Sequence, residues 1–433
     1  MEVNDSGNEY SRSQVPQSAT VAWWKIALIK IGVVIALPAF ISGAEIGSLM
    51  GLRRGMLAIF IGASVLAILA AFTGAIAARS HLTTALIARH AFGDKGARVV
   101  GIVLAATLLC WFGVTAELFG QSLRRISDDF FGLGISTAPY IIAGGGLMVM
   151  TTIYGFKALQ RLADWAVPVL LIGLVGMAYY GVRQAAPGVL DAAPAHSPPL
   201  GYGISAVIGS LAAGITIFPD VARFARSSNH ARGAAIVTYA FSLPAVLLLA
   251  AIPSIATGER DLIAIMTGLG LGIPAFVFLL LTAWTTNSGN LYSATLGIST
   301  SLPRLPFKSL ALILGVIGIA FSLSGVSASL IPLFVLISAT IPPVAGIYIA
   351  DFFVIRRGSY ADQGVAERPA YSLPAFMAWA AAAAVGICAA RGLIAIIGVP
   401  ALDAIAVAFA GYTALARLRC LSSPGRFFHR KTV

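Results

Sequence analysis

The sequence predicts an all-α integral membrane protein with twelve transmembrane helices. Of its 433 residues, 58% are hydrophobic and only 11% are charged, and the mean hydropathy is +0.89. Soluble globular domains do not have this composition, whereas an apolar run of about 18 or more residues is long enough to cross a bilayer. The runs of this kind are 26–50, 55–78, 97–122, 137–156, 163–183, 201–221, 233–257, 264–296, 307–325, 328–355, 371–390 and 393–415.

The basic residues predict how these spans are oriented. The net charge is +12, but no soluble basic domain is present, so we expect no nucleic-acid partner. Most Lys and Arg residues fall before the first span, in loops after even-numbered spans, or after the last span. Because basic loops stay in the cytoplasm, residues 1–25 and 416–433 are predicted to be cytoplasmic tails. The first 20 or so residues, rich in Ser, Gln and Asn, are expected to be mobile.

Cysteine usage and the N-terminus predict the cellular location. The three cysteines, Cys110, Cys388 and Cys420, are too few to indicate a disulfide framework. The first span is too long for a signal-peptide core and follows a polar segment. We therefore expect a multi-pass protein of a bacterial inner membrane that is a monomer or a weak oligomer in the lipid bilayer.

Helix breakers coincide in spans 1 and 6, which contain Pro38 and Pro219. The interior tryptophans Trp111 and Trp284 lie in spans 3 and 8. When their separation in residue number is added to residues 38–43 of span 1, the result is 211–216 of span 6. Spans 1–5 and 6–10 are therefore interpreted as two copies, and an odd number of spans per copy makes their topologies opposite. This pattern is typical of a five-plus-five inverted-repeat transporter with discontinuous helices 1 and 6, although such breakers also kink ordinary membrane helices.

The domain organisation follows from this repeat. The transport core is predicted to cover residues 26–355, as one repeat at 26–183 and a second at 201–355. Two peripheral transmembrane helices at 371–415 complete the membrane domain.

A polar string lies inside span 8, which is long enough to be broken or tilted. It reads Trp284-Thr285-Thr286-Asn287-Ser288-Gly289-Asn290-Leu291-Tyr292. Polar groups in the hydrocarbon region are costly unless they line a cavity or an ion path. The string therefore indicates transport.

Several motifs along the chain are shared with a known family. They are Val15-Pro16-Gln17-Ser18, Leu82-Thr83-Thr84, Ala88-Arg89, Phe92-Gly93, Trp111-Phe112-Gly113-Val114, Asp220 with Arg223-Phe224, Trp284-Thr285-Thr286-Asn287, Leu291-Tyr292 and Ile341-Pro342-Pro343 with Ala350-Asp351. In these motifs the chain resembles the nucleobase:cation symporter family, in its cytosine permease branch. The resemblance implies sodium- or proton-driven uptake of nucleobases and related heterocycles, with no cofactor other than the coupling ion.

The resemblance also implies a substrate site. Trp111 matches the aromatic that stacks on the substrate ring, and flat heteroaromatic rings suit such a platform. Asn287 matches a polar residue that hydrogen-bonds to the edge of the ring. An amide suits this role because it offers both donors and an acceptor. On span 6, Ser210 matches a position beside the ring, with Leu211 and the backbone near Ala213 completing that wall.

A cation site is implied between the broken part of span 1 and span 8. Its ligands would be backbone carbonyls near Leu37, Pro38 and Phe40 with the hydroxyls of Thr285 and Thr282. Oxygen ligands at a freed helix end suit a hard cation such as sodium, so sodium is favoured over the proton.

Four positions depart from the cytosine permease pattern. The branch carries a glutamine at Leu108, a second stacking aromatic at Leu211, an asparagine at Thr282 and an acidic residue at Ser288. A pocket that lacks a hydrogen-bond partner discriminates strongly against the original ligand. The substrate therefore stays open among cytosine, a purine, a hydroxymethylpyrimidine and a hydantoin-like ring.

Charged residues inside the spans have two interpretations each. Glu45 and Glu117 are either proton-coupling carboxylates or surface partners of Arg53 or Arg54 and of Arg124 or Arg125. Asp220 is either half of an inner gate or a structural partner of Arg223. Lys30 is expected to extend to the cytoplasmic surface, and the five histidines are expected to be solvated.

Two rival function classes are weighed against a symporter. An intramembrane enzyme would need a nucleophile–base pair, a motif such as His-Glu-x-x-His or paired carboxylates, and the spans contain none. A channel or receptor would not need two broken helices and paired repeats. The alternative within the transporter class is a proton-coupled permease for another small heterocycle that uses Glu45 or Glu117.

Overall fold

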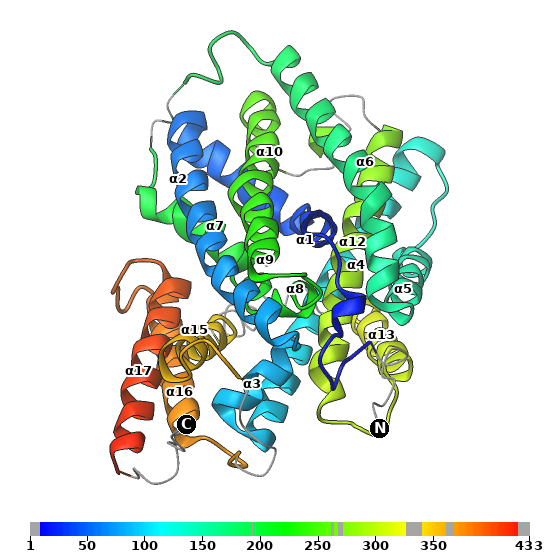
Figure 1. The fold of residues 1–433 in the computed structure, drawn as a ribbon. Coiled ribbons are helices and arrows are strands. Elements are labelled where there is room, and N and C mark those ends of the chain that lie inside the picture. Colours follow the sequence, from blue (N-terminus) through cyan, green and yellow to red (C-terminus); the bar gives the residue numbers. More distant parts are fainter. Residues whose placement is uncertain are drawn as a thin grey trace.

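The computed structural model describes residues 9–192, 194, 196–260, 264–266, 272–325, 340–360 and 368–422. These residues form helices and their connections (Figure 1). The elements are η2 (Gln17–Ala19), α1 (Trp23–Val34), α2 (Leu37–Ser80), α3 (Thr84–Phe92), α4 (Asp94–Phe131), α5 (Thr137–Ile153), α6 (Gly155–Gln184), α7 (Leu200–Thr216), α8 (Pro219–Ala222), α9 (Ser228–Ala235), η3 (Ile236–Ser242), α10 (Leu243–Thr257), α12 (Gly272–Ser299), α13 (Phe307–Leu323), α15 (Pro342–Ala350), η5 (Asp351–Ile355), α16 (Leu373–Ala390) and α17 (Pro400–Ser422).

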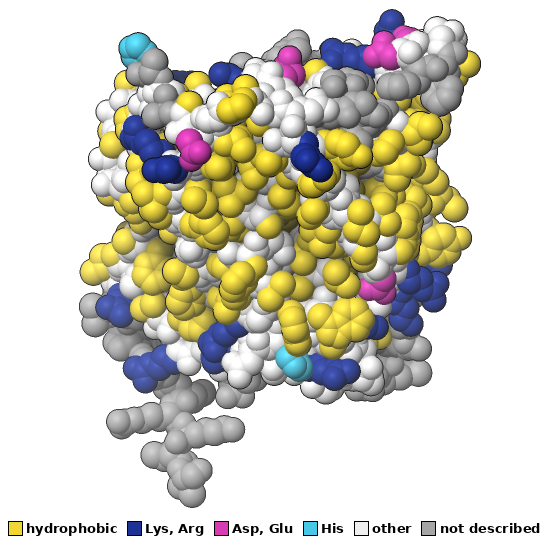
Figure 2. All heavy atoms as spheres, turned by 90° about the horizontal axis from the view of Figure 1, so that it is seen from above, with side chains coloured by type: hydrophobic (Ala, Val, Ile, Leu, Met, Phe, Trp, Pro, Cys, Tyr) yellow, Lys and Arg dark blue, Asp and Glu magenta, His cyan; other side chains and the backbone are white. Residues whose placement is uncertain are grey.

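Several helices can cross a membrane. Within the described ranges, six are long and apolar enough: Pro38–Ser80, Asp94–Asp129, Gly155–Gln184, Ser228–Thr257, Leu373–Ala390 and Pro400–Arg419. Figure 2 shows hydrophobic side chains across the middle of one face, with charged side chains gathered above and below them. The chain is therefore a multi-pass membrane protein.

Span 1 is discontinuous, as predicted, but its break lies at Ile35–Ala36 rather than at 38–43. α1 ends at Val34, and Ala36 is extended with φ −123° and ψ 153°. Pro38 sits in the first turn of α2, where a missing N–H costs nothing. Because a proline disfavours helical geometry in the residues before it, the break precedes Pro38. Gly43 instead allows α2 to approach the backbone of Leu247.

Span 6 is also discontinuous, but its break is displaced in the opposite direction along the chain. α7 ends at Thr216, and α8 begins at Pro219, so the break lies just beyond the predicted 211–216. Span 8, by contrast, is one continuous helix from Gly272 to Ser299, and the polar string lies within it. Gly51, with φ 69°, separates the two parts of α2 that correspond to the end of span 1 and to span 2.

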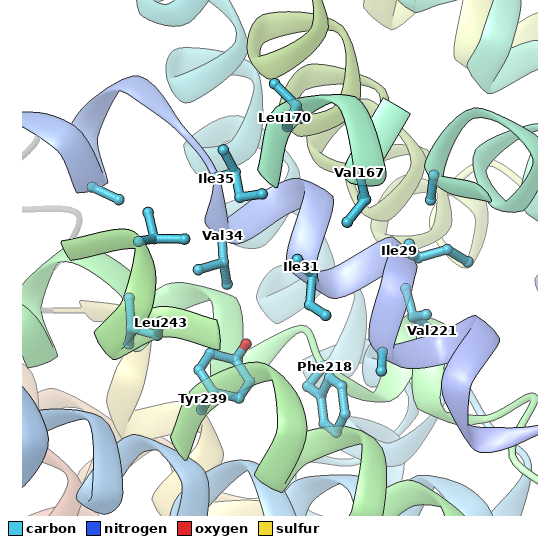
Figure 3. Packing of buried hydrophobic residues seen from close by; sticks show 14 of the residues in the cluster. Ile29, Ile31, Val34, Ile35, Val167, Leu170, Phe218, Val221, Tyr239 and Leu243 are labelled. Atoms are coloured by element: carbon cyan, nitrogen blue, oxygen red, sulfur yellow. The ribbon is translucent and has the colours of Figure 1, made fainter. Parts of the chain in front are cut away.

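Two groups of helices account for most of the packing. The first group is α2, α7, α9 and α10, and the second is α4, α5, α12 and α13. α1 lies between them and also packs on α6. Figure 3 shows Ile31 and Val34 of α1 between Val167 of α6 and the side chains of Phe218 and Tyr239. The predicted peripheral helices, α16 and α17, pack together at one edge of the molecule (Figure 1).

His90 corrects the expectation that the histidines are solvated. It is 8% exposed at the end of α3, and its ring stacks on Tyr360 with centroids 3.8 Å apart. Burial, together with Arg368, Arg356 and Arg89, lowers the pKa of His90 to about 3. The folded protein therefore keeps this ring neutral.

A pH dependence of stability follows from His90. The unfolded chain protonates this histidine below pH about 6.5 and the folded chain does not, so the stabilisation is present above that pH and is lost as pH falls. The loss is at most about 1.4 kcal/mol per pH unit. His90→Phe keeps the ring stack but cannot be protonated. We expect its melting temperature to fall less than that of the wild type when the pH is lowered from 7 to 5. The exposed-site control His196→Phe should behave like the wild type.

Candidate functional site

Asn287 lies where α4 and α12 pack closely. Farther along the same two helices, Gly101 and Gly297 let the backbones approach. Asn287 is fully buried, and its Nδ2 donates to the Phe112 carbonyl of α4 at 3.0 Å and to Met148 Sδ at 3.4 Å. Its Oδ1 is buried without a hydrogen-bond partner.

An unpaired buried amide oxygen is costly, about 1–3 kcal/mol, and most such groups in native proteins are satisfied. The bonds of Nδ2 to Phe112 and Met148 fix the side chain, so the oxygen cannot turn away to find a partner. Asn287 therefore holds a free acceptor in the middle of the bundle, which a donor on a ligand would satisfy.

Trp111 precedes Phe112, whose carbonyl accepts from Asn287, in α4. Its side chain is half-buried, and Leu108, one turn earlier, is buried. Trp284, the equivalent residue of the second predicted repeat, has other partners. Its Nε1 donates to Thr151 Oγ1 at 2.8 Å, and its ring packs edge-on against Trp165. The role of Trp111 as the aromatic that stacks on the substrate stays a prediction.

The span 6 residues contribute less directly. Ser210 Oγ donates to the Val207 carbonyl of its own helix at 2.8 Å. Leu211 and Ala213 are half-buried, and Ala213 packs on the hydrophobic cluster that contains Leu108 and Phe112. Ser288, beside Asn287, is buried and donates to the Met148 carbonyl at 3.4 Å.

A cluster of oxygen atoms lies where α1 ends against α12. The Thr285 hydroxyl is 2.9 Å from the carbonyl oxygens of both Gly32 and Leu281, and 3.2 Å from that of Thr282. Thr286 Oγ1 is 3.5 Å from the Val33 carbonyl. Because α1 stops at Val34, its last carbonyls have no following helical turn whose N–H groups could donate to them. Carbonyl and hydroxyl oxygens of this kind fit a hard cation.

The predicted cation ligands lie partly elsewhere. Leu37, Pro38 and Phe40 begin α2, so their carbonyls face the next turn of that helix, and Phe40 packs edge-on against Phe278. Thr282 turns its hydroxyl to Leu279 of its own helix at 3.0 Å, and its carbonyl faces Thr285.

Sequence reasoning missed Gly32, Val33 and Thr286. Positions 282, 285 and 286 share one face at helical spacing, which was the available signal for Thr286. The part of the chain that the structure describes contains no cluster of three His, Cys, Asp or Glu side chains placed for a metal ion.

In the part of the chain that the structure describes, Arg53, Arg54 and Arg124 pair with groups other than the two glutamates. Glu45 accepts a hydrogen bond from Tyr202 of α7, whereas Arg53 pairs with Asp191 and Arg54 donates to the Pro198 carbonyl. Glu117 is 7% exposed and accepts from Gln121 at 3.0 Å. Arg124 pairs instead with Asp128.

The charges beside the two helix breaks also differ from expectation. Lys30 does not extend to the surface: it is 3% exposed, with its ammonium 5.7 Å from the Phe218 ring centroid. Asp220 accepts from the Thr84 amide at 2.8 Å, while Arg223 Nε donates to the backbone carbonyl of Asp220 rather than to its carboxylate.

Comparisons with known proteins point to one family. A family model described as a permease for cytosine/purines, uracil, thiamine and allantoin matches residues 14–412. The cytosine permease of Escherichia coli (strain K12) is 31% identical over 356 residues, which cover 81% of this chain and 82% of that protein. The hydantoin permease of Microbacterium maritypicum is 26% identical over 371 residues, covering 80% and 74% of the two chains.

A solved structure shows the same fold. Mhp1, a nucleobase-cation-symport-1 family transporter in a closed conformation with bromovinylhydantoin bound, superimposes with a TM-score of 0.78. The match is 23% identical in sequence and covers 96% of each chain. The chain therefore shares its overall fold with this solved transporter.

Proposed function

Because the chain belongs to the permease family for cytosine, purines, uracil, thiamine and allantoin, we propose that it is a secondary active symporter that imports a nucleobase or a related nitrogen heterocycle with a cation. Its relatives are permeases and not enzymes. The proposal includes twelve spans in a five-plus-five inverted repeat, and an inner-membrane location with both termini in the cytoplasm.

The observation that carries the substrate class is the free acceptor of Asn287. A nitrogen heterocycle presents ring N–H groups in its plane and an aromatic face at right angles to them. Asn287 Oδ1 would accept from the ring edge while Trp111 stacks on the face. The apolar side chains of Leu108 and Leu211 favour a ring with fewer polar edge groups than cytosine, such as a hydantoin-like ring, and Ser210, Ala213 and Ser288 complete the proposed walls.

The coupling cation is proposed to be sodium. The oxygen cluster of Gly32, Val33, Thr285 and Thr286, with the Thr282 carbonyl, supports this choice because it offers neutral oxygen ligands. A cation there would hold α1 to α12, and each ligand would favour the state that binds the other. The alternative is a proton-coupled permease that uses Glu45 or Glu117, of which Glu117 is the more buried.

The proposal is tested by thermal stabilisation of the purified protein. Cytosine, purines, hydroxymethylpyrimidine, hydantoin and allantoin are each added with and without sodium, because a ligand that binds only the folded state raises its stability with occupancy. We expect one ring to raise the melting temperature, more so with sodium, and Trp111→Ala to remove the shift. If no ring shifts the melting temperature in any salt, the proposed ligand class is wrong.

A further inference from the structure

Residues 9–21, here called the N-terminal strap, lie against one end of the helix bundle (dark blue in Figure 1). The prediction of a mobile tail is wrong for these residues, because Ser11 and Val15 are buried. Glu9 and Tyr10 have φ of 57° and 47°, which is unfavourable for residues other than glycine. The surrounding contacts must therefore hold this backbone in place.

One side of the strap is joined to the end of α2 and to the segment after α8, which packs on α2 in the first helix group. The Val15 amide donates to the carbonyl of His81, which caps α2, at 3.0 Å, and the Val21 amide donates to the Phe224 carbonyl at 2.8 Å. The fully buried Arg223 donates to the carbonyls of Glu9 at 2.7 Å and Tyr10 at 2.8 Å. The strap then continues directly into α1.

The other side of the strap is joined to α12 of the second group through side chains. The Arg12 guanidinium donates to the carbonyl of Ser299, the last residue of α12, at 3.1 Å, and to those of Leu302 and Leu305 in the following loop at 3.2 and 2.6 Å. Ser299 Oγ donates to the Ser11 carbonyl at 3.5 Å. Tyr292 Oη, on α12, lies 3.0 Å from Arg223 and 3.4 Å from Glu9.

These contacts bridge two helix groups that otherwise pack mainly within themselves. In transporters of this kind, one group rocks against the other to open each side in turn. On the side of the first group, two backbone–backbone bonds hold the strap in addition to those of Arg223, whereas every bond to α12 and the loop after it involves a side chain. The connection to α12 is therefore the one that can be broken without unfolding the strap.

We propose that the N-terminal strap is a cytoplasmic gate, which stays on the first helix group and must release α12 before the cytoplasmic side opens. This inference rests on the proposed transport function and on the cytoplasmic position of the N-terminus. Arg12 and Tyr292 are positioning residues in this gate, because they contact the strap and α12 rather than the substrate.

A cross-link tests the gate directly. Ser11→Cys with Ser299→Cys, in a chain whose three native cysteines are replaced by alanine, joins the strap to α12 on oxidation. We expect uptake into proteoliposomes to fall at least about tenfold, since the locked state cannot exchange, and to return on reduction. The matched control is Ala44→Cys with Ser254→Cys, where Ser254 Oγ likewise donates to a backbone carbonyl, that of Ala44, within the first group. Undiminished uptake by the cross-linked strap would overturn the proposal.

A second measurement needs neither substrate nor coupling ion, so its outcome is independent of the proposed function. Ser293, beside Tyr292 in α12, is 5% exposed, and Ser293→Cys in the same background reports opening by its reaction with a maleimide in inside-out vesicles. We expect Arg12→Ala to raise the labelling rate about tenfold, because the carbonyls of Ser299, Leu302 and Leu305 lose their charged donor. Arg54→Ala, which removes a bond to a carbonyl outside the strap, should leave the rate unchanged. Equal rates in both variants would contradict the gate.

Discussion

Replacing Asn287 by leucine is expected to weaken binding of the heterocycle by roughly one to two orders of magnitude. The substitution removes the only acceptor at this position that the folded protein leaves unpaired, so a ring N–H buried there would lose its partner. It also removes the donor to the carbonyl of Phe112, the residue that follows Trp111 in α4. Ligand-induced thermal shifts, titrated with the ring that stabilises the wild type, measure the loss.

The control for Asn287→Leu is Thr152→Val. Thr152 is fully buried on α5, and its hydroxyl lies 3.2 Å from the Ser288 carbonyl of α12. It therefore contacts the helix segment next to Asn287 without offering it an acceptor. We expect the control to keep the affinity of the wild type within about threefold. Equal losses in both variants would mean that Asn287 supports helix packing and does not contact the substrate.

Replacing Thr285 and Thr286 together by valine is expected to lower the apparent sodium affinity at least about tenfold. Valine keeps the branched shape of threonine and removes only the two hydroxyl oxygens that face Gly32 and Val33. The affinity for the ring in the absence of sodium should change little. The measurement is the sodium dependence of the thermal shift at a fixed concentration of the ring.

Thr282→Val separates a ligand role from general packing. Its hydroxyl bonds within α12, and only its carbonyl, which valine retains, faces the oxygen cluster. We expect its sodium dependence to match that of the wild type. A loss in Thr282→Val as large as in the double variant would place the cation elsewhere.

The membrane class and most helix positions could be predicted because they depend on composition and on apolar run length. Discontinuity in spans 1 and 6 was also foreseen from Pro38 and Pro219. The exact break positions were not, because proline is accepted inside the first turn of a helix. The breaks therefore fall before the prolines, at Ile35–Ala36 and Ile217–Phe218. As a result, the carbonyls that face α12 are those of Gly32 and Val33 and not those near Pro38.

The site could be predicted only where neighbouring residues in sequence determine it. Trp111, Asn287 and Thr285 came from local motifs, and their roles stay predictions. The partners of these residues, such as the Phe112 carbonyl and Gly32, depend on how α4, α12 and α1 pack, which no single-chain pattern records. The same holds for Glu45, whose partner Tyr202 lies on a distant helix.

Lys30 and the strap show a second limit. Snorkelling was inferred from distance along α1 alone, but the Lys30 side chain turns toward Phe218 at the second break. The polar N-terminal segment was expected to be mobile from its composition. Its amides and carbonyls are instead paired with His81, Phe224 and Arg223, and these pairings arise only after the helices have packed.

The most direct test of cation-coupled import is uptake of the stabilising heterocycle into proteoliposomes under imposed ion gradients. We predict that an inward sodium gradient drives accumulation above the external concentration and that collapsing the gradient releases the ring. Thr285→Val with Thr286→Val should lose this accumulation at low sodium. Accumulation driven by an inward proton gradient without sodium would contradict the proposed cation site and would favour Glu45 or Glu117 as the coupling group.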